Sequence, residues 1–395
     1  MPPVKLTIPG EYWDSYIYAG RLYLFERGGS LRTVDWDRLI RETGVPEHLR
    51  LAMMCAFVRS DYLYRPATQE IMHDSEVRAV IKAKLEELAL RELDISLGAL
   101  ERHTIGVQDN PFPYPHSDVE IYSAQMYVGT STGVYRSTCH KKSGYPVSSR
   151  PAREWDVPAF GLAANYGSMA IAGGSEGLFE LDLGLGYDTG MPEDKPLSTR
   201  PCRDCGWTFV SIFASSDHAG YWARFSKGRE DAYESDAPRS FQRVETARQV
   251  FGGDGYSWGI QEKLYQVRDG AIVVLRYTPW AASEAERVKR LGTIRFQSWK
   301  GDVVSGGAAT FGAVVELDKA LVIIPSRGEP VTLRCEPVNW RVLPRSRHYE
   351  NHLHVVREDH LEIHSFNQDY EVDQEAKLAG TAFWDSGRGK AAPLW

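Results

Sequence analysis

Apolar and polar residues alternate in short runs along most of this chain, and each run stops at small or polar turn-forming residues. The clearest run spans residues 126–136, where Met-Tyr-Val-Gly and Val-Tyr-Arg flank the bend Thr-Ser-Thr-Gly. Because neighbouring side chains of a strand point to opposite faces of a sheet, this pattern predicts two strands joined by a tight turn. An antiparallel hairpin is therefore the expected local unit.

Related units return along the chain, and from residue 119 onward they follow at intervals of roughly 40 to 56 residues, close to the length of one four-stranded propeller blade. We place them at residues 12–36, 119–137, 159–181, 207–225, 256–277, 312–334 and 352–365. The 35 glycines and the 11% of aromatic residues suit many short strands joined by turns. The repetition predicts an architecture that grows by adding small sheets.

The period of the pattern changes between residues 37 and 105. In the longest segment of this region, residues 75–93, the apolar positions recur at helical spacing; they include Val77, Val80, Ile81, Leu85 and Leu88. Apolar residues three and four positions apart share one face of an α-helix. The sequence therefore predicts a helical insertion within an otherwise β-rich chain.

The repeated units resemble in layout the WD-repeat, Kelch and quinoprotein-like β-propellers. The chain departs from the WD-repeat pattern, since no regular Gly-His pair opens a unit. Trp36-Asp37 and Trp384-Asp385 are isolated instances of the pair that closes a WD repeat. The resemblance therefore implies the fold and carries over no family's catalytic residues.

From this resemblance we expect an all-β fold, a six- or seven-bladed β-propeller with a helical insertion after the first blade. The expected organisation is a first blade in residues 1–36, the insertion in 37–105 and the remaining blades in 106–395. Because an unpaired edge strand invites aggregation, we also expect the termini to close the ring by pairing. The candidate strands are Lys5–Ile8 and Leu378–Trp384.

Composition narrows the functional classes. The formal net charge of −7 argues against binding of nucleic acid through a field over the whole surface. No run of eighteen apolar residues and no apolar leader segment is present, so we expect no membrane partner. Five cysteines in 395 residues do not make a disulfide framework. We expect a soluble, cytoplasmic protein of bacterial type.

Cys202 and Cys205 form a Cys-x-x-Cys pair that resembles half of a zinc knuckle. A structural Zn²⁺ needs two further ligands, and the adjacent residues Cys139 and His140 are the candidates for them. The alternative is a pair of free thiols in a loop, because a single Cys-x-x-Cys is a weak signal. A structural zinc site therefore stays one of two interpretations.

Histidines are concentrated near the C-terminal end of the last unit. On a strand, His352 and His354 point to the same face, and so do His360 and His364. Such pairs suit a metal or a channel, but strands also carry histidine without any ligand. The sequence shows no fixed carboxylate partner for these histidines that would favour the metal site.

The insertion offers adaptable apolar and aromatic side chains for a protein partner. The candidate partner-binding residues are Met53, Met54, Phe57, Tyr62, Tyr64 and Met72. The alternative is that these residues only pack the helices against the neighbouring blade. Periodicity does not distinguish the two, because it does not show which apolar face stays exposed.

No constellation of residues identifies a reaction, so the leading hypothesis is a non-catalytic scaffold or adaptor. Its inter-blade loops and helical insertion would hold a protein partner. One alternative is a hydrolase or lyase whose site lies at the mouth of the propeller channel. Another is a nucleic-acid or nucleotide sensor with a local arginine-rich face formed by Arg341, Arg345, Arg347 and Arg357.

Overall fold

The structure is a computed structural model of the 395-residue chain. It describes residues 2–58, 71, 74–139, 147–184, 196–217, 219–226, 239–279, 281, 283–295, 301–325, 329–346 and 348–367. These residues belong to two compact units. One unit draws on Met1–Asn110, Ala308–Val314 and Ala320–Trp395, and the other on Pro111–Gly307 and Val315–Lys319.

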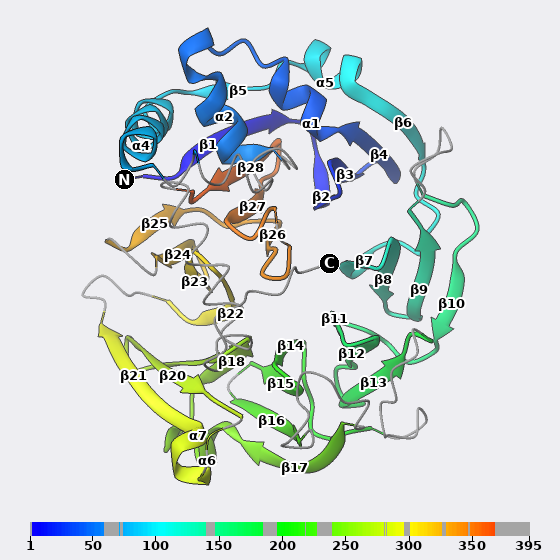
Figure 1. The fold of residues 1–395 in the computed structure, drawn as a ribbon. Helices are drawn as coiled ribbons and strands as arrows, with labels where there is room; N and C mark the ends of the chain where they lie inside the picture. The colour runs from blue at the N-terminus through cyan, green and yellow to red at the C-terminus, as the bar shows by residue number, and fades with distance from the viewer. Residues whose placement is uncertain are drawn as a thin grey trace. The chain divides into compact units, whose positions relative to one another are not determined.

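The described strands form seven small sheets, labelled in Figure 1, in which neighbouring strands run antiparallel except where noted below. The fold is therefore a seven-bladed β-propeller. The sequence left the blade count open between six and seven, and the structure has seven. The first sheet contains β2 (Tyr12–Tyr18), β3 (Arg21–Glu26), β4 (Ser30–Asp35) and β6 (Thr104–Asp109). The second contains β7 (His116–Tyr122), β8 (Gln125–Thr130), β9 (Gly133–Thr138) and β10 (Ala152–Trp155).

The next three sheets follow in chain order. The third contains β11 (Gly161–Asn165), β12 (Ser168–Ala172) and β13 (Leu178–Asp182). The fourth contains β14 (Asp204–Thr208), β15 (Ser211–Ser216), β16 (Ala219–Ser226) and β17 (Ser240–Thr246). The fifth contains β18 (Tyr256–Ile260), β19 (Lys263–Arg268), β20 (Ala271–Tyr277) and β21 (Val288–Arg295).

The last two sheets complete the set. The sixth contains β22 (Val303–Ala309), β23 (Gly312–Leu317), β24 (Ala320–Pro325) and β25 (Val331–Arg334). The seventh has the order β26 (Asn339–Val342), β27 (His352–Val356), β28 (His360–Ser365), β1 (Val4–Pro9) and β5 (Leu93–Asp94). The N-terminal strand thus belongs to the sheet of the last strands, not to the sheet of β2–β4.

The hairpin expected at residues 126–136 is confirmed. Strands β8 and β9 pair in register, with Gly129 opposite Val134 and Thr130 opposite Gly133. The Thr130 hydroxyl accepts a hydrogen bond from the Thr132 N–H at 3.1 Å and donates to the Gly133 carbonyl at 2.9 Å. A side chain at Gly133 would meet the Trp155 carbonyl oxygen, so glycine is required here.

Central strands of the blades are buried on both faces, which explains their near-continuous apolar runs. All five residues of β12 are buried, and Met169 and Ile171 pack with Phe179 and Leu181 of the neighbouring strand β13. Each such cluster joins the facing sheets of two successive blades. Burial of this kind removes apolar surface from water at roughly 25 cal/mol per Å² and holds adjacent blades together.

An aspartate recurs at the start of three innermost strands. One carboxylate oxygen of Asp14, Asp118 and Asp204 accepts the N–H of the next residue at 2.7–2.8 Å. The second oxygen of Asp118 accepts the Leu162 N–H of the following blade at 2.8 Å. All three carboxylates therefore satisfy a backbone group near the start of a strand, and Asp118 also links neighbouring sheets.

The helical insertion lies between β4 and β6 of the first sheet. Its elements are α1 (Trp36–Arg41), the short 3₁₀ turn η1 (Glu47–Leu49), α2 (Arg50–Phe57), α4 (Ser75–Ala89), β5 and α5 (Leu97–His103). Two further short helices, α6 (Ala247–Phe251) and α7 (Glu284–Arg287), lie in the other unit. The Asp74 side chain caps α4 by accepting the N–H groups of Glu76 and Val77. Among the described residues, no helix has the length and apolar character needed to cross a membrane.

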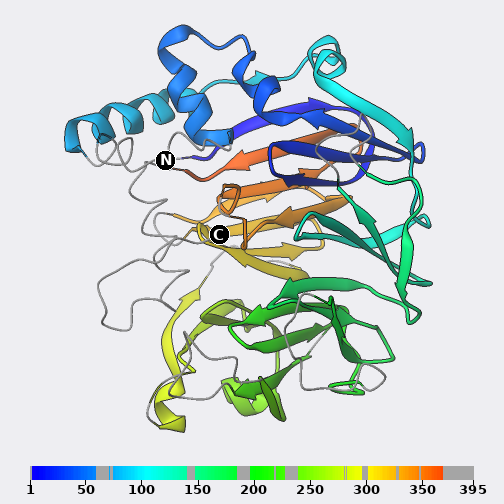
Figure 2. The ribbon, with the colours of Figure 1, turned by 45° about the vertical axis from the view of Figure 1, so that its right-hand side comes forward.

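The insertion covers the outer edge of the seventh sheet, as Figure 2 shows on the side where the helices lie beside β1 and β28. Strand β1 pairs antiparallel with β28, from Val4 opposite Ser365 to Pro9 opposite His360. On its other side, β1 pairs in parallel with β5, and the Ile95 N–H donates to the Thr7 carbonyl at 2.9 Å. The expected closing segment Lys5–Ile8 lies in β1, whereas Leu378–Trp384 lies outside the described residues.

Candidate functional site at the helical insertion

Side chains of the seventh sheet bind the C-terminal carbonyl groups of helix α2. The Ala56 carbonyl accepts hydrogen bonds from His352 Nε2 at 2.8 Å and from Ser365 Oγ at 2.7 Å. The Cys55 carbonyl accepts one from Asn367 Nδ2 at 2.8 Å. The last carbonyls of a helix have no partner within the helix, so these donors satisfy groups that would otherwise need water. The insertion is thus docked on β27 and β28 by specific hydrogen bonds.

An aromatic layer completes this docking. The Phe57 ring lies 6.2 Å from Trp36 and 5.7 Å from His352, measured between ring centroids. Tyr349 lies on the other side of His352 at 5.5 Å. Because edge-on and tilted aromatic contacts are favourable, the layer stabilises the helix against the sheet beyond simple burial.

Two of the expected partner-binding residues are buried within this packing. Met53 and Phe57 are buried, so their side chains are not offered to another molecule. The interpretation of these two residues as contact surface is therefore corrected. The apolar face of their helix packs against the seventh sheet of the same chain. Met54 is half-buried. Tyr62, Tyr64 and Met72 lie outside the described residues.

The outer face of the insertion does retain apolar side chains. Helix α4 buries Ile81, Leu85 and Leu88 against its neighbours. Its outer face and the following turn expose Val80 (53%) and Leu90 (82%). Other large apolar side chains exposed on the insertion are Leu51, Ile71 and Leu97. The insertion therefore has a docked inner face and an outer face that carries apolar groups in water.

A buried polar network lies where β2 and β26–β27 meet. Asp14 accepts a hydrogen bond from Arg341 Nη2 at 2.7 Å, and the Arg341 guanidinium lies 5.1 Å from the Tyr16 ring centroid. Beside this ion pair, Ser15 Oγ lies 2.9 Å from His354 Nδ1. Ser15 and His354 have the composition of a nucleophile and its base, but both are fully buried, so a substrate cannot reach them.

Burial sets the charge of the two histidines of β27. Desolvation lowers the pKa of His352 to about 4, against the weaker opposing effect of its hydrogen bond to the Ala56 carbonyl. Burial also lowers the pKa of His354 well below its usual range, and nearby His352 and Arg341 lower it further. Because a carbonyl oxygen only accepts, the neutral His352 ring carries its proton on Nε2.

The remaining histidines of this region surround a carboxylate. Glu362 lies 3.1 Å from His364 Nε2, 3.1 Å from Arg357 Nη2 and 3.5 Å from His360 Nε2. Burial alone would raise the pKa of Glu362, but His364 and Arg357 together lower it far below its usual range. Among the described residues, no group of three or more His, Cys, Asp or Glu side chains is arranged to hold a metal ion.

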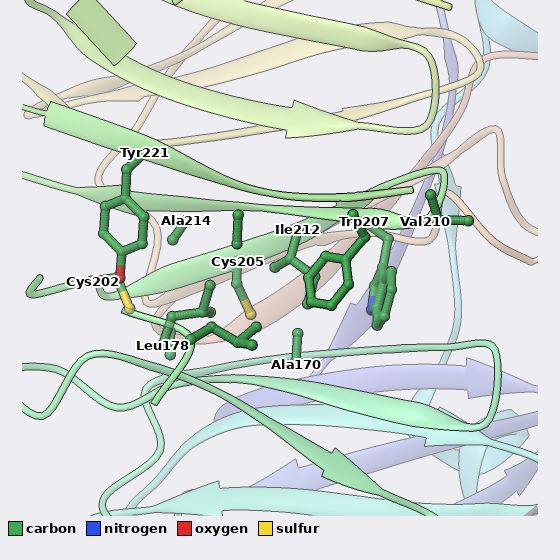
Figure 3. Packing of buried hydrophobic residues seen from close by; sticks show 13 residues of the cluster. Ala170, Leu178, Cys202, Cys205, Trp207, Val210, Ile212, Ala214 and Tyr221 are labelled. Atoms are coloured by element: carbon green, nitrogen blue, oxygen red, sulfur yellow. The ribbon is translucent and has the colours of Figure 1, made fainter. Parts of the chain in front are cut away.

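The cysteine pair lies in a hydrophobic cluster of the other unit, shown in Figure 3. Cys202 and Cys205 are buried among Leu178, Trp207 and Ile212. Desolvation raises the pKa of the Cys202 thiol to about 11 and that of Cys205 well above its usual value. Without a metal ion nearby, burial therefore keeps both thiols protonated.

The other half of the proposed zinc site is described only in part. Cys139 forms an isolated β-bridge with Val147, and His140 lies outside the described residues. The four-ligand site therefore stays a prediction. The alternative places both thiols in a loop, whereas Cys205 lies in strand β14 and both thiols are buried.

The arginine-rich stretch near the C-terminal end is largely engaged within the chain. Arg341 pairs with Asp14 and Arg357 with Glu362. Arg345 is exposed, and Arg347 lies outside the described residues. Two of the four guanidinium groups expected on a nucleic-acid face are thus neutralised by carboxylates.

The fold therefore defines this chain as a seven-bladed β-propeller. No protein-family model matches the sequence, and a comparison with curated proteins finds no match. Solved structures show similarity of fold at low sequence identity. A computationally designed Ika8 protein has a TM-score of 0.43 at 7% identity, over 93% of this chain and 100% of that chain.

Two natural proteins give similar values. A putative 6-phosphogluconolactonase from Bacteroides fragilis has a TM-score of 0.38 at 10% identity, over 64% of this chain and 79% of that chain. Hsv2 of Kluyveromyces lactis has a TM-score of 0.39 at 13% identity, over 61% of this chain and 70% of that chain. These are fold-level likenesses only, and they assign no family or activity.

Proposed function

We propose that this protein is a scaffold that binds a protein partner through the outer face of its helical insertion. The observation that carries the proposal is the division of the insertion into two faces. Its inner face is fixed to the seventh sheet through His352, Ser365 and Asn367. Its outer face keeps Val80 and Leu90 in water.

Exposed aliphatic groups on a rigidly held helix suit association with another protein. Leu90 follows the last turn of α4, and Val80 lies on the exposed side of the same helix. Charged residues of both signs flank them, including Lys82, Glu86 and Arg91, all exposed. Exposed aliphatic side chains interspersed with charges of both signs support a non-obligate protein interface here.

The buried network around Ser15 and His354 supports the scaffold over the enzyme. A nucleophile and base need access to substrate, and these two side chains have none. The hydrogen bond between Ser15 and His354 instead holds β2 against β27, and the Asp14–Arg341 ion pair holds β2 against β26. Ser15 and His354, whose side chains most resemble a catalytic pair, thus stabilise the packing between two blades.

Point variants test the proposal better than removal of residues 38–104, because that deletion would uncover β1 and leave the ends of β27 and β28 without their helix. Partners captured by the tagged wild-type protein from its own cells would be identified by mass spectrometry and rebuilt from purified components. The double variant V80D/L90D should lose the partner. The double variant F160D/V304D changes two exposed apolar residues of the other unit and should retain it.

Equal binding by wild type and V80D/L90D would contradict the proposal. A partner lost equally from both double variants would also contradict it, because the interaction would then follow general surface hydrophobicity. Circular dichroism of each variant would show that its fold is intact.

A further inference from the structure

Strand β21 is the last strand of the fifth sheet, and its outer side has no paired strand among the described residues. The sheet has the order β18-β19-β20-β21, and the register of β21 is with β20 alone, from Ala271 opposite Arg295 to Tyr277 opposite Val288. An end strand of eight residues presents a row of N–H and C=O groups. Such an edge can pair with an extended segment of another chain.

The side chains of β21 carry one sign of charge. Its sequence, Val-Lys-Arg-Leu-Gly-Thr-Ile-Arg, contains Lys289, Arg290 and Arg295 and no carboxylate. All three cations are exposed, and none forms an ion pair with a described residue. Arg290 instead donates a hydrogen bond to the Thr293 hydroxyl.

Two other edge strands carry charges that are paired within the chain. On β17, Arg243 pairs with Glu245 at 2.9 Å, and on β10, Glu154 pairs with Arg136 of β9 at 2.9 Å. Native proteins commonly place lysine or arginine on an edge to prevent pairing, which is the alternative for β21. That alternative does not explain why Leu291 and Ile294 are exposed on the same strand, at 47% and 37%.

We infer that β21 is a docking edge for an extended acidic peptide, which would add a strand beside it. Backbone hydrogen bonds to the open edge would supply affinity, and carboxylates of the peptide would meet Lys289, Arg290 and Arg295. Aliphatic side chains of the peptide would cover Leu291 and Ile294. Because β21 lies in a different unit from the insertion, this surface is independent of the one proposed above.

A nucleic acid would also be attracted by three cations, but the strand favours a peptide. Single-stranded nucleic acid is held chiefly by aromatic rings on which bases stack, together with cations. Strand β21 contains no aromatic residue, and its exposed apolar groups are aliphatic. Aliphatic groups beside an open backbone edge match an extended polypeptide.

The test uses a fluorescein-labelled peptide of eight alternating glutamate and valine residues, titrated with the full-length protein at low salt. Binding should be at least tenfold weaker for K289E/R290E/R295E. It should be unchanged for R150E/K319E/R334E, which reverses three exposed charges elsewhere. The same peptide with N-methyl groups along one edge should also bind at least tenfold less tightly, because it cannot form the backbone ladder. Bound peptide should slow hydrogen exchange in residues 288–295.

Four results would overturn the inference. These are no binding of the acidic peptide, equal binding of a lysine–valine peptide, no effect of the β21 charge reversal, or tighter binding of a single-stranded oligonucleotide that displaces the peptide. Loss of peptide binding would leave the partner captured through Val80 and Leu90 unaffected, so the two proposals fail separately.

Discussion

His352 of the seventh sheet donates a hydrogen bond from Nε2 to the carbonyl oxygen of Ala56, the penultimate residue of helix α2, over 2.8 Å. The two residues are 296 positions apart in the sequence. This contact joins the insertion, which leaves the first sheet, to the sheet formed by the last strands. Through the insertion, it therefore links the first and the seventh sheets.

Loss of this hydrogen bond should destabilise the protein. His352→Ala removes a buried ring that contacts Phe57 and Tyr349, and we expect it to lower the free energy of unfolding by about 2–4 kcal/mol. His48→Ala is the matched control, because His48 is exposed and its pairing with Glu87 is a solvent-screened surface contact that should contribute little to stability. Urea unfolding followed by tryptophan fluorescence measures both. Equal midpoints for the two variants would refute the role of His352.

Acid should weaken the same contact region. The pKa of His352 is about 4 in the folded protein and about 6.5 when unfolded, so the unfolded chain takes up the proton first as pH falls. Its stabilising contribution is complete above pH 6.5 and is lost as pH falls through 4, reaching a deficit of about 2 kcal/mol at pH 5. Glu362 acts in the same direction at lower pH, because its pKa is lowered on folding.

Unfolding free energies at pH 7 and pH 5 check the contribution of His352. His352→Gln keeps a donor near Ala56 but does not titrate, so this variant should lose less stability between the two pH values than the wild type. An identical loss in wild type and variant would mean that His352 is not the titrating group.

A second buried contact joins the third and fourth sheets. Arg239 donates two hydrogen bonds to Glu180, at 2.5 and 2.6 Å, and its guanidinium lies 3.6 Å from the Phe225 ring centroid. Removing one partner leaves the other charge buried without its counter-ion. Glu180→Gln or Arg239→Met should therefore lower the free energy of unfolding by about 3–5 kcal/mol. The double variant E180L/R239M replaces both charges with apolar groups and should recover most of that loss. Additive losses in thermal or urea unfolding would contradict this account.

Glycine should be required at position 133 and not at position 28. At Gly133, φ is +135° and a Cβ atom would lie 1.9 Å from the Trp155 carbonyl oxygen. Gly133→Ala should therefore destabilise the second sheet by at least about 1 kcal/mol. Gly28 has open space around it, so Gly28→Ala should be close to neutral. A comparison of melting temperatures distinguishes the two, and equal values would contradict the steric argument.

Much of the architecture could be read from short apolar runs separated by turn residues, because strands packed between blades bury apolar side chains and each hairpin needs a turn. The sequence also contains an aspartate that recurs near the start of three of the units. Asp14, Asp118 and Asp204 lie in the first residues of β2, β7 and β14, and each accepts the next backbone N–H. This repeated aspartate would have aligned the units and helped to decide between six and seven blades.

The contacts that define the candidate site could not be read from the sequence. Nothing local to His352 or Ala56 indicates that they meet, because their approach depends on how the insertion folds back over the last strands. The same limit explains Met53 and Phe57, whose helical spacing predicts an apolar face but not what covers it. Burial of Cys202 and Cys205 likewise depends on residues from strands that a motif search does not bring together.

Hydrogen exchange with the captured partner bound tests the central claim most directly. The account predicts slower exchange in residues 75–92, around Val80 and Leu90, with the exchange of residues 52–57 in the docked helix α2 unchanged. Protection confined to the propeller strands and loops, with residues 75–92 exchanging as in the free protein, would contradict it.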